Sequence, residues 1–137
     1  TIWSDATWAP DYGDWYDNYA STSGSCVSAD PNGADLLVFN STKQSTVALS
    51  SAESEWAAAT ESAKDAAYII NLFRDLNMHC QLPLMLNCDN QSAIKQSVRS
   101  FDQQRSRHVG MRMNYLRSQC HRGKISMPMG PDKLTVV

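Results

Sequence analysis

A chain of 137 residues is the size of one compact domain, so we expect a single domain over residues 1–137. Its hydrophobic fraction of 42% and charged fraction of 19% are those of a globular protein in water, and its net charge of −2 argues against binding nucleic acid by overall charge alone. No apolar run approaches the roughly 20 residues of a bilayer span, and the N-terminus lacks a signal-peptide pattern, so we expect no membrane role and no secretion address. The four cysteines form no C-x-x-C pair, which predicts reduced thiols and argues against a zinc or redox site.

The first part of the chain predicts strands. Residues 1–8 alternate polar and apolar side chains, and residues 9–24 are a loop rich in turn formers and aromatic residues. The segments 23–29 and 34–41 flank DPNG, a strong turn signal, and therefore predict a hairpin.

Residues 50–77 predict a long amphipathic helix. Ser50 or Ser51 is the expected N-cap, followed by acids in the first turn. The apolar side chains recur at steps of three and four residues, at Trp56, Ala59, Ala63, Ala66, Ala67, Ile70, Phe73 and Leu76.

The second half of the chain alternates strands and helices. LMLNC, residues 84–88, predicts a strand buried in a sheet, and residues 90–98 predict a short helix. Residues 107–123 predict a helix that stops at Gly123, and residues 124–129 predict a last strand. The inward stripe of the longer helix is expected at Val109, Met113, Leu116 and Cys120. The sum is an α/β architecture with a mixed sheet.

Four carboxylates lie at the ends of predicted elements: Asp5, Glu55, Asp89 and Asp132. If the first and fourth strands are neighbours, Asp5 and Asp89 lie side by side and the long helix brings Glu55 over them. Such crowding costs on the order of several kcal/mol unless divalent cations neutralise it. Oxygen ligands suit Mg²⁺ or Mn²⁺, and two such ions roughly 3.5 to 4 Å apart cleave phosphodiesters without a nucleophilic side chain.

Each of these acids also has an ordinary structural explanation. Asp89 can be a helix N-cap, Asp5 a surface residue, Glu55 a first-turn acid that favours the helix dipole, and Asp132 a cap in a polar tail. Glu53 competes with Glu55, but the two point about 200° apart on a helix, so at most one joins the cluster. A Ser-His-Asp site is disfavoured because the chain has no G-x-S-x-G elbow.

A family resemblance strengthens the metal interpretation. The segments SDATWAPD, STSGSCV, NSTKQSTVALSSAESEWAAATESAKDAAYI, LNCDNQSAIKQ and RSRHVGMRMNYLR, in that order, resemble the ribonuclease H domain of copia-type retrotransposon polyproteins. The resemblance covers nearly the whole chain, and it implies a ribonuclease H-like fold with a mixed five-stranded sheet flanked by helices. It also implies hydrolysis of the RNA strand of RNA–DNA hybrids by two Mg²⁺ (or Mn²⁺) ions held by Asp5, Glu55, Asp89 and Asp132.

Three departures from the family pattern bear on activity. The segment between GKIS and PDKLT is short, and an alignment without a gap puts Val136 at the fourth metal position, leaving three acids. Gly110 stands where an acid commonly follows the histidine. The sequence given stops before the closing helix typical of the fold, and whether a neighbouring subunit completes this end is left open by the sequence.

We expect the substrate to be recognised by the shape of the hybrid's minor groove and by contacts to its 2′-hydroxyls. Asn90 and Gln91 are candidates for hydroxyl or base-edge contacts, and Arg105, Arg107 and His108 for phosphate contacts, within a stretch that carries eight Lys or Arg residues and one acid between Lys95 and Lys124. A solvated helix face explains the same charges.

The resemblance also sets the expected partners and setting. The reverse transcriptase domain of the same polyprotein is the expected partner, within an intracellular setting, either a cytoplasmic particle or the nucleus. Two rivals remain: a non-catalytic ribonuclease H-like module that serves as a structural or binding subunit, and a related nuclease or integrase-like fold with another nucleic-acid substrate.

Overall fold

The computed structural model describes residues 1–8, 20–88 and 107–127, with side chains from Gly110 onward in the last range. Within these ranges, no helix is both long enough and apolar enough to cross a bilayer. The predicted short helix at residues 90–98 lies outside the described residues.

A mixed five-stranded sheet forms the base of the fold. Its strands are β1 (Ile2–Thr7), β2 (Thr22–Ser28), β3 (Leu36–Lys43), β4 (Leu84–Cys88) and β5 (Ile125–Ser126), in the order β3-β2-β1-β4-β5. The strands β1, β2 and β3 pair antiparallel, whereas β4 pairs parallel to both β1 and β5. The predicted hairpin is confirmed, and the strand at 84–88 has the bounds that the sequence predicts.

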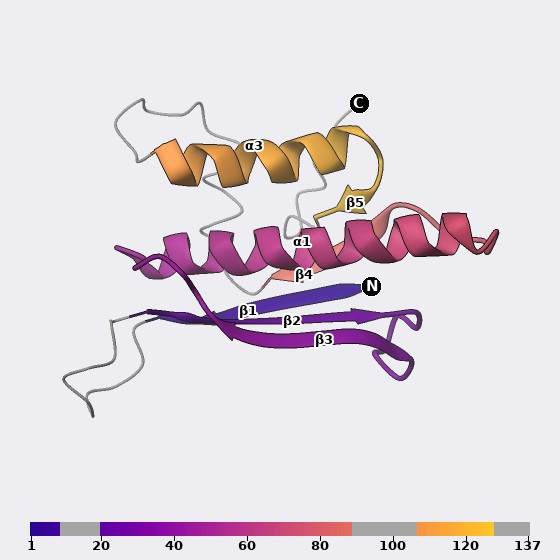
Figure 1. The fold of residues 1–137 in the computed structure, drawn as a ribbon, viewed down its shortest axis with the longest axis horizontal. Helices are drawn as coiled ribbons and strands as arrows, with labels where there is room; N and C mark the ends of the chain where they lie inside the picture. Colours follow the sequence, from indigo (N-terminus) through magenta and orange to yellow (C-terminus); the bar gives the residue numbers. More distant parts are fainter. Residues whose placement is uncertain (9–19, 89–106, 128–137) are drawn as a thin grey trace.

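Two helices lie on one side of this sheet, as Figure 1 shows. The helix α1 (Ser51–Asp75) packs on β1 and β2, and α3 (Arg107–His121) packs on the outer side of α1. The sheet, α1 and α3 therefore form three successive layers (Figure 1). This arrangement is the α/β architecture with a mixed five-stranded sheet that the sequence predicts.

The start of α1 is fixed by the predicted serine cap. Ser50 has extended backbone angles, and its Oγ accepts a hydrogen bond from the Glu53 amide at 3.2 Å. The Glu53 carboxylate in turn accepts from the Leu49 amide at 2.9 Å. The first bond engages a donor of the first helical turn, and the second ties the residue before the cap to the same turn.

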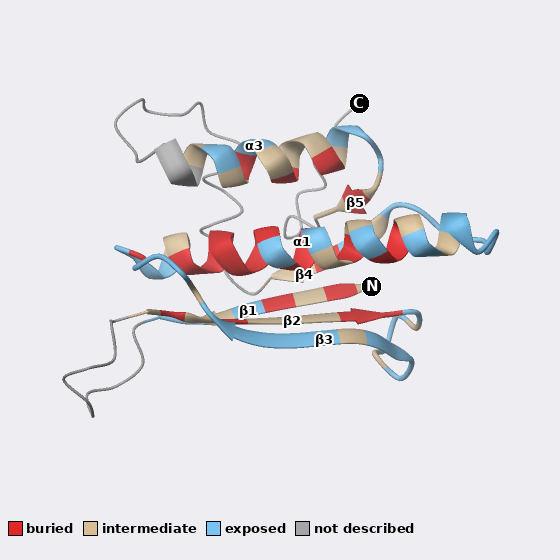
Figure 2. Cartoon of the chain, in the orientation of Figure 1, coloured by how far each residue is buried: buried red, intermediate tan, exposed pale blue. Residues whose placement is uncertain are grey.

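The core lies between the sheet and α1, where small side chains on the helix let it approach the strands. Ile2, Val27 and Leu86 come from the sheet and are at most 1% exposed. They meet a helix stripe that contains Trp56, Ala59, Ala63 and Ala66, and Met113 and Leu116 of α3 extend the same cluster. Figure 2 shows this burial as a red band along α1.

The predicted apolar stripe of α1 does not stay buried to its end. Leu76, the C-cap residue, is 60% exposed. The reason is length: a helix of 25 residues spans about 37 Å, whereas a strand of eight spans about 27 Å, so the last turns of α1 extend past the sheet.

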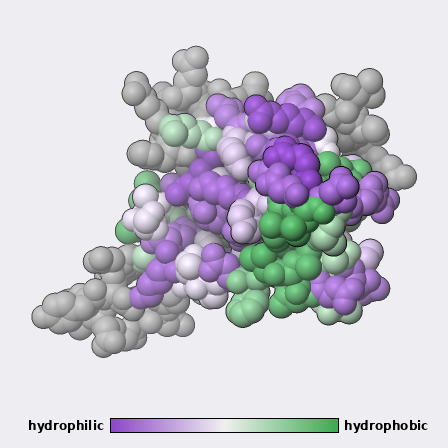
Figure 3. All heavy atoms as spheres, turned by 45° about the vertical axis from the view of Figure 1, so that its right-hand side comes forward, coloured by the Kyte–Doolittle hydropathy of each residue, from purple (hydrophilic) through white to green (hydrophobic). Residues whose placement is uncertain are grey.

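Apolar side chains also reach the surface on the edge strand. Leu36, Leu37 and Phe39 of β3 are 41% to 78% exposed, because β3 is the last strand of the sheet and α1 covers its centre. On the face drawn in Figure 3, apolar side chains gather in one patch bordered by hydrophilic ones.

Candidate active site

The side chain of Glu55 lies between α1 and the end of β4. It is 7% exposed, because every residue from Ser54 to Thr60 is buried at the point where α1 enters the molecule. The Cys88 thiol, at the last position of β4, donates a weak hydrogen bond to Glu55 Oε2 at an S···O distance of 3.8 Å. A carboxylate buried to this degree is expensive to ionise unless a cation or hydrogen bonds compensate.

Glu53, the alternative acid, has a different setting. Its carboxylate bonds the Leu49 amide as part of the helix cap. Glu55, two residues later, instead faces the sheet. Within α1 the two acids therefore divide into a capping residue and a residue buried against β4.

Asp5 lies on the strand next to β4 but on the other face of the sheet. The buried Ser4 pairs with Ser25, whose Oγ donates to the Asp65 carboxylate of α1 at 2.7 Å, so Ser4 and Ser25 face the helix. Because side chains alternate along a strand, Asp5 points away from α1, and it is exposed. Asp5 and Glu55 thus approach the sheet from opposite sides.

A cavity of about 530 Å³ lies where the middle of β1 meets the end of β4. Its lining includes Asp5 and Cys88, the residue that contacts Glu55. The other lining residues are Trp3, Ser4, Gly24, Ser25, Cys26, Asn40 and Asn87. The parallel register pairs Ser4 with Cys88, which places Asp5 one residue beyond the last pair. The predicted adjacency of the first and fourth strands is therefore confirmed.

Most of the other predicted site residues cannot be placed. Asp89, Asn90, Gln91, Arg105 and Asp132 lie outside the described residues. Arg107 and His108 begin α3, where the backbone alone is described. Across the ranges 1–8, 20–88 and 107–127, no group of three His, Cys, Asp or Glu side chains is close enough to hold a metal ion.

The structure adds three side chains that the sequence analysis does not single out. Asn40 and Asn87 line the cavity, and Cys88 contacts Glu55. Asn87 lies two residues before Asp89 in the sequence. Because side chains two residues apart on a strand share a face, alternation along the strand is a signal that could have identified Asn87. Asn40 could not have been found this way, because its place depends on the register of β3 against β2.

Comparison with known proteins points to mobile elements of plants. The chain is 35% identical over 81 residues to the retrovirus-related Pol polyprotein from transposon TNT 1-94 of Nicotiana tabacum, which covers 59% of this chain. It is 28% identical over 123 residues, 90% of this chain, to the polyproteins from transposons RE2 and RE1 of Arabidopsis thaliana. No family model and no solved structure matches the chain.

These similarities concern a small part of each relative. The matched segments span 6% to 8% of the length of the three polyproteins. The chain is therefore similar to one section of retrotransposon Pol polyproteins. This agrees with the copia-type element suggested by the sequence motifs.

Proposed function

We propose that the chain is a metal-dependent ribonuclease H-type endonuclease that hydrolyses the RNA strand of RNA–DNA hybrids, as a section of a retrotransposon polyprotein. The observation that carries the proposal is the buried Glu55 carboxylate, held against Cys88 at the end of β4, beside the strand that bears Asp5. Asp89 is bonded directly to Cys88. In this proposal Asp89 joins Asp5 of β1 and Glu55 of α1 in one metal site.

The chemistry of these donors fits a hard divalent cation. Glu55 is an oxygen donor in a site that water barely reaches, and Asp5 offers a second carboxylate at the rim of the cavity. Asp5, Glu55 and Asp89 would hold Mg²⁺ or Mn²⁺, with Asp132 as the fourth ligand. When bound, two such ions supply an activated water and stabilise the leaving oxygen of a phosphodiester.

The remaining predicted residues serve substrate binding in this proposal. Asn90 and Gln91 follow Asp89 and contact 2′-hydroxyls or base edges, and Arg105, Arg107 and His108 contact phosphates. The reverse transcriptase domain of the same polyprotein supplies the hybrid. The similarity to Pol polyproteins supports this context.

Cleavage of a labelled RNA–DNA hybrid tests the proposal. With Mg²⁺ or Mn²⁺ we expect cleavage of the RNA strand, abolished by a chelator. Glu55→Gln and Asp89→Asn should each lower kcat/KM roughly a hundredfold or more, since each removes a metal ligand. Glu53→Gln is the matched control, because its side-chain oxygen can still accept from Leu49, and its activity should stay near that of the unaltered chain.

A non-catalytic structural or binding module is the second candidate. The observation in its favour is that Asp5 points away from α1, and that the described residues alone form no cluster of three metal ligands. Binding of the hybrid without cleavage at any Mg²⁺ or Mn²⁺ concentration would favour this module. Cleavage that persists in a chelator or in Asp89→Asn would instead overturn the metal mechanism.

A further inference from the structure

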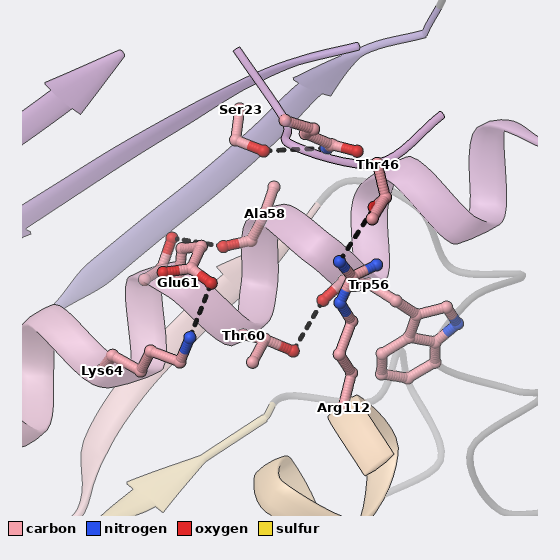
Figure 4. Close-up of polar contacts among 10 residues, drawn as sticks. Ser23, Thr46, Trp56, Ala58, Thr60, Glu61, Lys64 and Arg112 are labelled. Carbon is pink, nitrogen blue, oxygen red and sulfur yellow. Dashed lines mark hydrogen bonds and ion pairs between the residues drawn. The ribbon is translucent and has the colours of Figure 1, made fainter. Parts of the chain in front are cut away.

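The segment 44–50, between β3 and α1, contributes no ligand to the proposed site, yet hydrogen bonds join it to several other elements. Arg112 of α3 donates from Nη2 to Thr46 Oγ1 at 3.2 Å, and the Trp8 indole donates to the Ala48 carbonyl at 3.1 Å. Figure 4 shows Arg112 reaching from α3 to Thr46. The segment belongs to the KQSTVALSSAESEW block that carries the family resemblance.

Gln44 makes the connection that bears on the site. Its backbone amide donates to the Ser21 carbonyl at 2.7 Å, continuing the ladder between β2 and β3. Its side-chain Nε2 donates to Ser23 Oγ of β2 at 2.8 Å and to the Ser54 carbonyl of α1 at 2.9 Å. The bond at Ser23 is the dashed line at the top of Figure 4. Ser23 and Ser54 are 6% and 0% exposed, so these partly buried bonds are shielded from much of the competing water.

We propose that Gln44 is a positioning residue for Glu55. The carbonyl of Ser54 belongs to the peptide group that joins Ser54 to Glu55, and this group is planar. The Gln44 amide is bonded to Ser23 of β2. It therefore restrains the orientation of this peptide plane, whose last atom is the Glu55 Cα. The bond to Ser54 thus reaches the backbone one residue before Glu55, whose carboxylate meets Cys88 at the end of β4.

A primary amide is the group that this position requires. One NH₂ supplies both donors, to a hydroxyl on the sheet and to a carbonyl on the helix. Glutamate has no donor at neutral pH, and methionine has the same length with no donor at all. Gln44→Met therefore removes the two bonds with little change of volume and no change of charge.

The inference rests on the proposed function in its metal-binding part, so the test has two readouts. The first is hydrogen exchange at the amides of residues 55–60, which Gln44→Met should accelerate roughly threefold to tenfold, because a bond of this kind stabilises the native state by that factor. The second is the Mg²⁺ concentration that gives half-maximal hybrid cleavage, which should rise roughly threefold or more while the KM for the hybrid stays unchanged.

Thr46→Val is the matched control. It removes the exposed bond to Arg112 in the same segment without touching Ser54, so it should leave both readouts within error of the unaltered chain. Gln44→Met with unchanged exchange at residues 55–60 would overturn the inference. So would faster exchange with an unchanged Mg²⁺ requirement, because that result describes a merely structural residue.

If the proposed function is wrong, the cleavage assay gives a different result from the ones above. The unaltered chain would then cleave no hybrid at any Mg²⁺ concentration, whatever the state of residue 44. In that case Mn²⁺ binding by the unaltered chain and by Gln44→Met, followed by electron paramagnetic resonance, replaces the cleavage readout. Equal binding by the two proteins would overturn the positioning role, and weaker binding by Gln44→Met would support it.

Discussion

Polar contacts made by α1 differ in how much they stabilise the fold, according to how exposed they are. Ser25 Oγ donates to the Asp65 carboxylate at 2.7 Å across the partly buried interface of β2 and α1. Lys64 and Glu61 form an ion pair of the same length, 2.7 Å, on the outer face of α1, where both side chains are more than half exposed. Equal distances therefore do not imply equal stabilisation, since solvent screens the second pair.

A double-mutant cycle in urea measures this difference. The cycle of Ser25→Ala and Asp65→Ala should give a coupling free energy of about 1 to 2 kcal/mol, as expected for a hydrogen bond to a charged group away from bulk water. The cycle of Glu61→Ala and Lys64→Ala should give about 0.3 kcal/mol. Equal coupling in the two cycles would contradict the distinction by burial.

Cys120 is a residue whose titration the fold alters. Burial on α3 raises the pKa of its thiol, because the charged thiolate loses hydration. A raised pKa means that the folded state holds this proton more tightly than the unfolded state does. The resulting stabilisation is complete below the ordinary thiol pKa of about 8.5 and is lost as the pH rises through the folded value.

We therefore expect the free energy of unfolding to fall above about pH 8.5, and to fall less steeply in Cys120→Ala. Urea unfolding between pH 7 and pH 10 checks this expectation. The same residue should react with iodoacetamide more slowly than in the urea-unfolded chain at pH 8. An identical pH slope in the two proteins would show that Cys120 does not contribute.

At the scale of elements, the start of α1 depends on its cap. Ser50→Ala removes the acceptor for the Glu53 amide and should lower the free energy of unfolding by about 1 kcal/mol. Ser51→Ala, one position later and exposed, should change it by less than about 0.5 kcal/mol. Chemical denaturation followed by circular dichroism distinguishes the two. A larger loss in Ser51→Ala would mean that the cap is misassigned.

The elements themselves follow from local patterns. The strand at 84–88, the hairpin around DPNG and the cap at Ser50 are predictable because their signals lie within a few residues of each other. Gln119 of α3 is 5% exposed although it is polar, and no local pattern predicts its burial. Its place follows from Leu116, three residues earlier on the same helix face, once α3 has packed on α1.

The candidate site was harder to predict than the elements for a similar reason. Alternation along β1 places Asp5 on the other face of the sheet from Ile2 and Ser4. Which of the two faces α1 covers is decided by tertiary packing. The bonds of Gln44 join positions 21 and 10 residues apart in sequence. Such contacts depend on register and layer order, which composition and periodicity do not contain.

For the whole molecule, the proposed function predicts that the buried Glu55 carboxylate couples stability to metal binding. In the proposed site, the charge of Glu55, which is 7% exposed, is less favourable without a cation than with one. Glu55→Gln keeps the shape and removes the charge, so in a chelator this variant should be as stable as the unaltered chain or more stable by about 1 to 2 kcal/mol.

Added Mg²⁺ should reverse this order. A ligand that binds the folded state stabilises it by RT ln(1 + [L]/Kd), which is about 2.7 kcal/mol at a hundredfold excess over Kd. The thermal midpoint of the unaltered chain should therefore rise with Mg²⁺ by roughly 5 to 10 °C, and that of Glu55→Gln by much less. NaCl at matched ionic strength controls for general screening. Parallel rises in both proteins would place any bound Mg²⁺ away from Glu55, and would remove the physical reason for a buried acid at the end of β4.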